Sequence, residues 1–93
     1  MARKNCFETI SKIAERTAKY LTEIKPVHGK FVLKTNLGLL DCRSHSLNTG
    51  LYILRIEAGR AFIYLPNGYV IGLRSDESEK IAQAFANICG HRY

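Results

Sequence analysis

The chain has 93 residues, of which 46% are hydrophobic and 24% charged, and its 14 Lys and Arg against eight Asp and Glu give a formal net charge of +6. This length predicts a single domain, 1–93, with one modest core, and the composition argues against a disordered chain. No run of 18 apolar residues occurs, and the charged start MARKNCFETISK lacks the apolar segment of a signal peptide, so neither a membrane span nor a secretory signal is expected.

A long amphipathic helix is expected over residues 5–25. Its apolar residues recur at steps of three and four, which places them on one buried stripe. Asn5 and Glu8 have the spacing of an N-terminal capping box, and Pro26 and Gly29 are expected to end the helix. The stripe consists of Phe7, Ile10, Ala14, Thr17, Leu21 and Ile24.

From residue 30 onward the apolar residues follow a period of two, which predicts strands. Tight turns separate them, so neighbouring strands should pair antiparallel. Ser75 is placed to cap a second helix over 76–89, whose first turn is acidic. The five expected strands lie at 30–35, 39–43, 51–57, 60–65 and 69–74, with 44–50 as a loop. The predicted fold is α+β, a five-stranded antiparallel meander sheet flanked by an N-terminal and a C-terminal helix packed mainly on one face.

The hairpin turns assign the strand residues to two faces. Asn67-Gly68 is a strong signal for a two-residue turn because both positions accept positive φ, and Ala58-Gly59 is interpreted in the same way. Residues directly opposite each other share a face. The first face is almost entirely apolar and holds Tyr52, Leu54, Ile56, Ala61, Ile63, Leu65, Val70 and Gly72. The second holds Leu51, Ile53, Arg55, Glu57, Arg60, Phe62, Tyr64, Tyr69, Ile71 and Leu73, with Lys30, Lys34 and Arg43 added by parity.

Both helices fit on the first face. Five strands about 4.8 Å apart make a sheet roughly 24 Å wide, and two helices packed about 8–10 Å apart cover most of it. The second face would then be open, and its apolar rows would form a patch of the size that marks a binding surface. The alternative is that the first helix covers the second face, because runs such as AFIYL also suit a strand buried on both sides.

Two cysteines and two histidines are the first candidates for chemistry: Cys42 with His45, and Cys89 with His91. Together they are a legitimate zinc set, but structural zinc sites favour paired C-x2-4-C and H-x3-5-H spacings, which are absent here. Both cysteines fall at apolar positions, where free thiols are common core residues. Separate core thiols are therefore favoured over zinc, and no metal or cofactor is predicted.

Enzymatic activity is not predicted either. A nucleophile made of Cys42 with His45 or His91 would need an oxyanion-hole sequence, and none accompanies it. No small-molecule substrate is evident. Three cysteines are an odd number and no Asn-x-Ser/Thr site occurs, so we expect a reducing, cytoplasmic compartment.

The second face carries the functional prediction. We expect a small basic binding protein that docks a macromolecular partner there and acts as a regulator or inhibitor. Its Leu and Ile rows suit a protein partner. This partner is either another protein, such as a nucleic-acid-associated one, or a second copy of the chain in a homodimer. The alternative is direct binding of single-stranded nucleic acid, with rings stacked on bases and cations on phosphates. The predicted binding residues are Lys30, Lys34, Arg43, Ile53, Arg55, Arg60, Phe62, Tyr64 and Tyr69.

Overall fold

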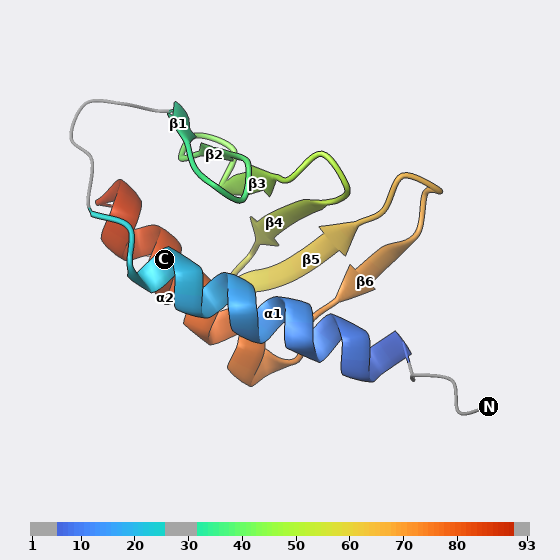
Figure 1. Cartoon of the computed structure of the whole chain (residues 1–93). Coiled ribbons are helices and arrows are strands. Elements are labelled where there is room, and N and C mark those ends of the chain that lie inside the picture. Colours follow the sequence, from blue (N-terminus) through green and yellow to red (C-terminus); the bar gives the residue numbers. More distant parts are fainter. Residues whose placement is uncertain (1–5, 26–31, 91–93) are drawn as a thin grey trace.

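The computed structural model describes residues 6–25 and 32–90. Its two helices and six strands confirm an α+β fold with an antiparallel meander sheet in the order β1 to β6 (Figure 1). The elements are α1 (Cys6–Thr22), β1 (Val32–Lys34), β2 (Leu39–Asp41), β3 (Ser46–Asn48), β4 (Ile53–Glu57), β5 (Arg60–Tyr64), β6 (Val70–Gly72) and α2 (Ser75–Cys89). The Asn5 cap and the Pro26 and Gly29 stop signals lie outside the described residues.

The prediction of five strands is wrong by one, because β3 forms within the segment expected to be a loop. Leu47 is the only apolar residue among the three of β3, and a single apolar position is too short a pattern to show a period of two. The strand exists because β2 and β4 supply pairing partners on both sides. Leu47 is completely buried, opposite Leu40 and Leu54.

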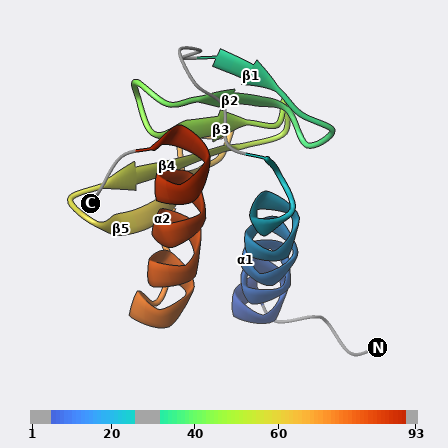
Figure 2. The same cartoon turned by 90° about the vertical axis from the view of Figure 1, so that its left-hand side faces the viewer.

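Both helices lie on the same side of the sheet, side by side, and run in the same direction (Figures 1 and 2). The meander explains this parallel arrangement. α1 ends near β1, the strands then pass one by one to β6 at the opposite edge, and α2 starts there and returns along α1. Near β1, the backbone N–H of Asn36 donates a hydrogen bond to the hydroxyl of Tyr20 at 3.0 Å, which joins the end of α1 to the β1–β2 turn.

The sheet face that the helices cover, called the inner face here, is aliphatic from edge to edge. Each central residue of its main row is at most 1% exposed, and burial of such a side chain stabilises the fold by about 1.5–3 kcal/mol. The helices add further core side chains, chiefly Leu21, Ile81, Phe85 and Ile88. The row crosses all six strands through Leu33, Leu40, Leu47, Leu54, Ile63 and Ile71.

The β4–β5 turn has the predicted two-residue form. Glu57 lies opposite Arg60, and both turn residues have positive φ, 52° at Ala58 and 80° at Gly59. This is the turn geometry whose twist matches that of the flanking strands. The predicted pairing of β4 with β5 is therefore confirmed along the whole hairpin.

The β5–β6 turn differs from the prediction and shifts β6 by one residue. Leu65 accepts a hydrogen bond from Gly68 and donates one to the carbonyl of Tyr69, which leaves a three-residue loop at 66–68. Such loops combine a type I turn with a residue of positive φ, and Gly68 has a φ of 92°. The shift exchanges the two faces of β6, because side chains alternate along a strand. Ile71 and Leu73 belong to the inner face, and Val70 and Gly72 to the other.

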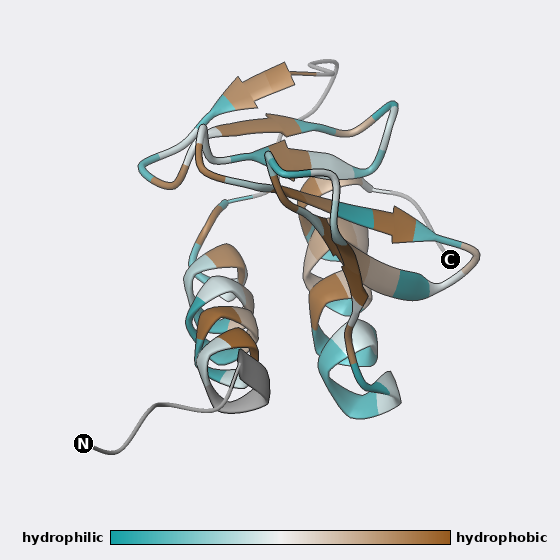
Figure 3. Cartoon of the chain, turned by 90° about the vertical axis from the view of Figure 1, so that its right-hand side faces the viewer, coloured by the Kyte–Doolittle hydropathy of each residue, from teal (hydrophilic) through white to brown (hydrophobic). Residues whose placement is uncertain are grey.

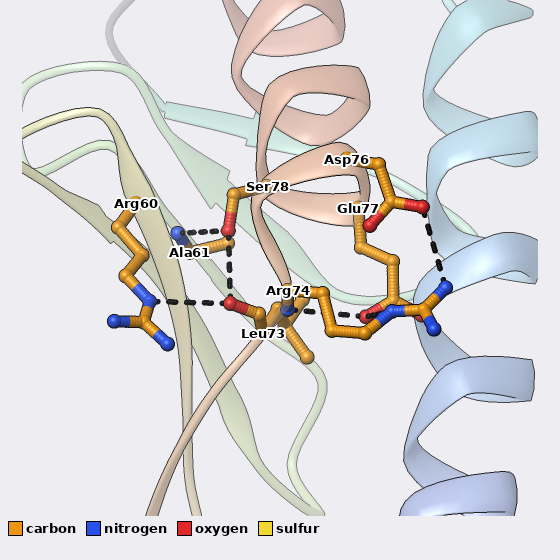
Figure 4. Close-up of polar contacts among 7 residues, drawn as sticks. All are labelled: Arg60, Ala61, Leu73, Arg74, Asp76, Glu77 and Ser78. Carbon is orange, nitrogen blue, oxygen red and sulfur yellow. Dashed lines mark hydrogen bonds and ion pairs between the residues drawn. The ribbon is translucent and has the colours of Figure 1, made fainter.

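Ser78 joins α2 to the sheet. Its hydroxyl accepts a hydrogen bond from the backbone N–H of Ala61 at 3.0 Å and donates to the carbonyl of Leu73 at 3.4 Å (Figure 4). At this point the chain leaves β6 for α2, so the backbone N–H of Ala61 in β5 needs an acceptor other than the β6 backbone. Ser78 is only 2% exposed and supplies the missing acceptor from inside the core.

The start of α2 is stabilised differently from the prediction. Arg74 is the N-cap residue, and Ser75, the expected cap, is already the first helical residue. The Glu77 carboxylate accepts the backbone N–H of Arg74 at 3.2 Å, and the Arg74 side chain pairs with Asp76 at 3.3 Å (Figure 4). In Figure 3 this acidic first turn is the hydrophilic end of α2, whereas hydrophobic stretches concentrate on the strands.

Replacement of Ala58 by Gly should raise the free energy of unfolding by about 0.5–1 kcal/mol, because Ala58 has a φ of 52° and Gly adopts that conformation without a Cβ clash. The matched change Gly59→Ala should lower it by a similar amount, since a Cβ there meets no atom within 4 Å and the cost is conformational alone. Urea unfolding of both variants measures the effects. Destabilisation by Ala58→Gly would contradict this turn geometry.

Candidate functional site

The sheet face away from the helices, the outer face, is left uncovered by both of them (Figure 2). Two rows of side chains cross it. The first consists of Val32, Asp41, Ser46, Arg55, Phe62 and Gly72, and the second of Lys34, Leu39, Asn48, Ile53, Tyr64 and Val70, with Glu57 and Arg60 at the β4–β5 end. Over β3 the face is polar, whereas Val32 and Leu39 are exposed apolar residues on β1 and β2.

Over β4 to β6 the outer face becomes apolar and aromatic. Ile53 is 38% exposed and Val70 is 51% exposed, with the ring of Tyr64 between them in the same row. Phe62 lies in the neighbouring row and is half-buried. Adjacent exposed aliphatic and aromatic side chains form the kind of surface that marks a binding site. We call this surface the β4–β6 patch: Ile53, Arg55, Arg60, Phe62, Tyr64 and Val70.

Tyr64 is held against the face by Glu57. Its hydroxyl donates a hydrogen bond to a carboxylate oxygen of Glu57. Tyr64 pairs with Ile53, and Glu57 lies four residues further along β4, which is about 13 Å of strand. The two side chains can meet only if both lie along the sheet. The hydrogen bond to Glu57, then burial and the negative charge of Glu57, raise the pKa of Tyr64, and Arg55 opposes this increase.

Arg60 is also fixed in position. Its Nε donates to the carbonyl of Leu73 at 3.2 Å, the same carbonyl that Ser78 contacts (Figure 4). Its guanidinium carbon lies 5.7 Å from the centre of the Phe62 ring, within cation–π range. Gly72 leaves room for this arrangement, because a Cβ there would lie 3.1 Å from a guanidinium nitrogen. The patch therefore presents a preordered cation beside an aromatic ring.

The structure brings together most of the predicted binding residues. The β4–β6 patch contains Ile53, Arg55, Arg60, Phe62 and Tyr64, and Lys34 lies on the same face at the β1 edge. Arg43 is exposed in the β2–β3 turn, where its backbone N–H donates to Asp41. Lys30 lies outside the described residues.

Tyr69 is placed wrongly by the prediction. It pairs with Leu65 beside the three-residue loop, on the parity of the inner face, and its side chain is 69% exposed at the end of the sheet. Val70 takes the place on the outer face that the two-residue turn gave to Tyr69. The sequence did not predict Val70 at this place, because the residues Pro66-Asn67-Gly68 are compatible with both a two-residue and a three-residue hairpin loop.

The prediction that Cys42 and Cys89 are separate core thiols is wrong. Cys42 and Cys89 form a disulfide, with 5.6 Å between their Cα atoms, so they are not separate thiols and neither can ligate zinc as a thiolate. Among residues 6–25 and 32–90, no three His, Cys, Asp or Glu side chains gather as a metal site requires. His45 lies in the β2–β3 turn with a φ of 52°, and His91 is outside the described residues.

Comparisons of this chain with protein-family models, with curated proteins and with solved structures find no match. Within the described part of the chain, neither helix is long and apolar enough to cross a membrane.

Loss of the disulfide should lower the free energy of unfolding by about 4 kcal/mol, because the bond joins residues 47 positions apart and restricts the unfolded chain. The measurement is urea unfolding of the wild type and of Cys42→Ala/Cys89→Ala, each with and without dithiothreitol. Reductant should destabilise the wild type and leave the double variant unchanged. Since the chain has three cysteines, the unreduced denatured protein should titrate one thiol, and three would contradict the bond.

Replacement of Glu57 by Ala should lower the pKa of Tyr64 towards the usual value of 10.0, because the hydrogen bond and the negative charge that raise it are both lost. A raised tyrosine pKa contributes stability that is present below pH 10 and lost as pH rises through the folded value. Titration of the Tyr64 ring carbon by NMR measures the shift. Asp41→Asn, on the same face, is the control and should leave this pKa unchanged. An unshifted Tyr64 in the wild type would contradict the Glu57 contact.

Proposed function

We propose that this chain is a non-enzymatic binding protein that docks a protein partner through the β4–β6 patch and acts as a regulator or inhibitor. The observation that carries the proposal is an uncovered sheet face on which Ile53 and Val70 flank the ring of Tyr64, with Arg55 and Arg60 beside them. Exposed aliphatic and aromatic side chains with arginines match the composition of protein interfaces.

Fixed side chains support this role. Interface residues that are already ordered lose less conformational entropy on binding. Tyr64 is held by Glu57, and Arg60 is held by the Leu73 carbonyl and stacks on Phe62. The patch therefore has two preordered aromatic rings and a preordered cation, the residue types that dominate binding energy at interfaces.

Direct binding of single-stranded nucleic acid is the second candidate, and one observation favours it. Arg55 and Arg60 lie on the same face as Phe62 and Tyr64, so bases and phosphates would both find contacts. Glu57 lies within reach of the Tyr64 hydroxyl, however, and its carboxylate repels a phosphate. The exposed Ile53 and Val70 add no base-stacking surface. The protein partner is therefore preferred.

A cytoplasmic location stays a proposal. The odd number of cysteines favoured it, and the disulfide weakens that inference. That expectation assumed free thiols, and the chain has a Cys42–Cys89 disulfide. Disulfides persist mainly in oxidising compartments, with intracellular proteins of hyperthermophiles as an exception.

Affinity capture from the source cells tests the proposal, with immobilised wild type, Ile53→Asp and Leu51→Asp compared after nuclease treatment. Ile53→Asp places a charge in the patch and should reduce retention of the partner at least tenfold. Leu51→Asp is the matched control, because Leu51 is 77% exposed in the β3–β4 turn, and it should retain the partner as the wild type does. Circular dichroism checks that both variants are folded.

Two results would contradict the proposal, the first by excluding the patch and the second by excluding a protein partner. Equal retention by Ile53→Asp and the wild type would exclude the patch. Loss of all retention after nuclease treatment, with affinity for an oligonucleotide falling steeply with salt, would favour the nucleic-acid alternative. A second copy as partner would appear as a dimer of the purified wild type in sedimentation, and Ile53→Asp would be monomeric.

A further inference from the structure

β6 is a three-residue edge strand whose sequence contains no charged residue and no proline. Natural edge strands generally carry charged residues or proline that prevent pairing with another chain. The five residues 69–73, Tyr-Val-Ile-Gly-Leu, contain neither. The described part of the opposite edge, β1, carries Lys34. Of the two edges, β6 is therefore the one suited to accept a further strand.

The backbone N–H and C=O groups of β6 are also oriented so that some of them point away from β5, as pairing with a further strand requires. The N–H of Leu73 donates to the carbonyl of Ala61, and the carbonyl of Tyr69 accepts from Leu65, so residues 69 and 73 face β5. Backbone groups alternate along an antiparallel strand. The N–H and C=O groups of Val70 and Gly72 consequently point away from β5, and among residues 6–25 and 32–90 no strand pairs with β6 on that side.

A groove lies beside this edge. It has a volume of about 740 Å³ and is formed by β6, the first residues of α2 and the N-terminal half of α1, which passes next to β6 in Figure 1. Ile10 and Ile71 give it an apolar lining, and the exposed Lys12 lies on its α1 wall. A strand paired with β6 would place every second side chain in this groove.

The groove fits an extended peptide better than a second copy of this chain. In each copy, α1 already lies beside the β6 edge. Pairing of two β6 strands would bring both α1 helices into the same space. A single extended peptide brings no helix with it and needs only the width of one strand, about 4.8 Å.

We propose that β6 binds an extended peptide segment of a partner protein as a seventh strand, with apolar side chains at alternate positions in the groove and a carboxylate beside Lys12. Arg74 is already paired with Asp76, which leaves Lys12 as the cation that selects an acidic residue. This site shares Val70 with the β4–β6 patch, but it uses the Val70 backbone at the sheet edge rather than the side chain on the outer face. It does not include Ile53 or Arg55, so Ile53→Asp distinguishes failure of one proposal from failure of the other.

The test uses a displayed library of random 12-residue peptides selected on the full chain, followed by affinity measurements with the enriched synthetic peptide. Val70→Pro removes an N–H that points away from β5, a change that an edge strand tolerates, and should weaken binding at least tenfold. Val70→Thr keeps the N–H and a similar shape, and should bind within twofold of the wild type. Lys12→Glu should weaken binding severalfold at low salt.

Amide chemical shifts of the wild type give a readout that does not depend on how well the proline variant folds. The peptide should shift the amides of Val70 and Gly72 most, and Ile53→Asp should leave its affinity unchanged. The proposal is overturned if the largest shifts fall at Ile53 and Arg55, if Val70→Pro binds as tightly as Val70→Thr while both are folded, or if selection yields no peptide that binds the chain.

Discussion

The fold depends on one continuous aliphatic row across the inner face of the sheet. Six aligned positions, one from each strand, place a Leu or Ile under the helices, and the four central ones are almost completely buried. Because side chains alternate, this requirement also decides which residues face outward. Two parallel helices suffice to cover the row, so no part of α1 or α2 is left for the opposite face (Figure 2).

The two ends of the helix pair are attached to the sheet by different means. At the β1 end, Tyr20 contacts the β1–β2 turn and the Cys42–Cys89 bond ties the end of α2 to the end of β2. At the β6 end, Ser78 satisfies the backbone of β5 where the chain leaves the sheet. A domain of this size has a small core and benefits from such additional links.

The outer face and the β6 edge are the two surfaces that this construction leaves available. The face is ordered by contacts among its own side chains, Tyr64 with Glu57 and Arg60 with Phe62. The edge is defined by backbone groups and by a groove that α1 completes. The two proposals use different chemistry on these surfaces: exposed aliphatic and aromatic side chains on the face, and backbone hydrogen-bonding groups at the edge.

The sequence by itself determined both helices, the antiparallel meander and the pairing of β4 with β5. These follow from local chemistry: the apolar period of each segment, and a two-residue turn at Ala58-Gly59 that fixes its own hairpin. The outward position of Ile53, Arg55, Phe62 and Tyr64 follows from the same register, so most of the candidate site could be predicted.

Only the tertiary structure decided the remaining features, since each depends on residues distant in the chain. β3 has no pattern of its own and is a strand because β2 and β4 lie beside it. The loop at 66–68 takes three residues rather than two, which buries Leu73 and turns Val70 outward; the same turn residues permit either length, and the core selects between them. Cys42 and Cys89 meet because the end of α2 returns to β2, and no spacing along a sequence can show that approach.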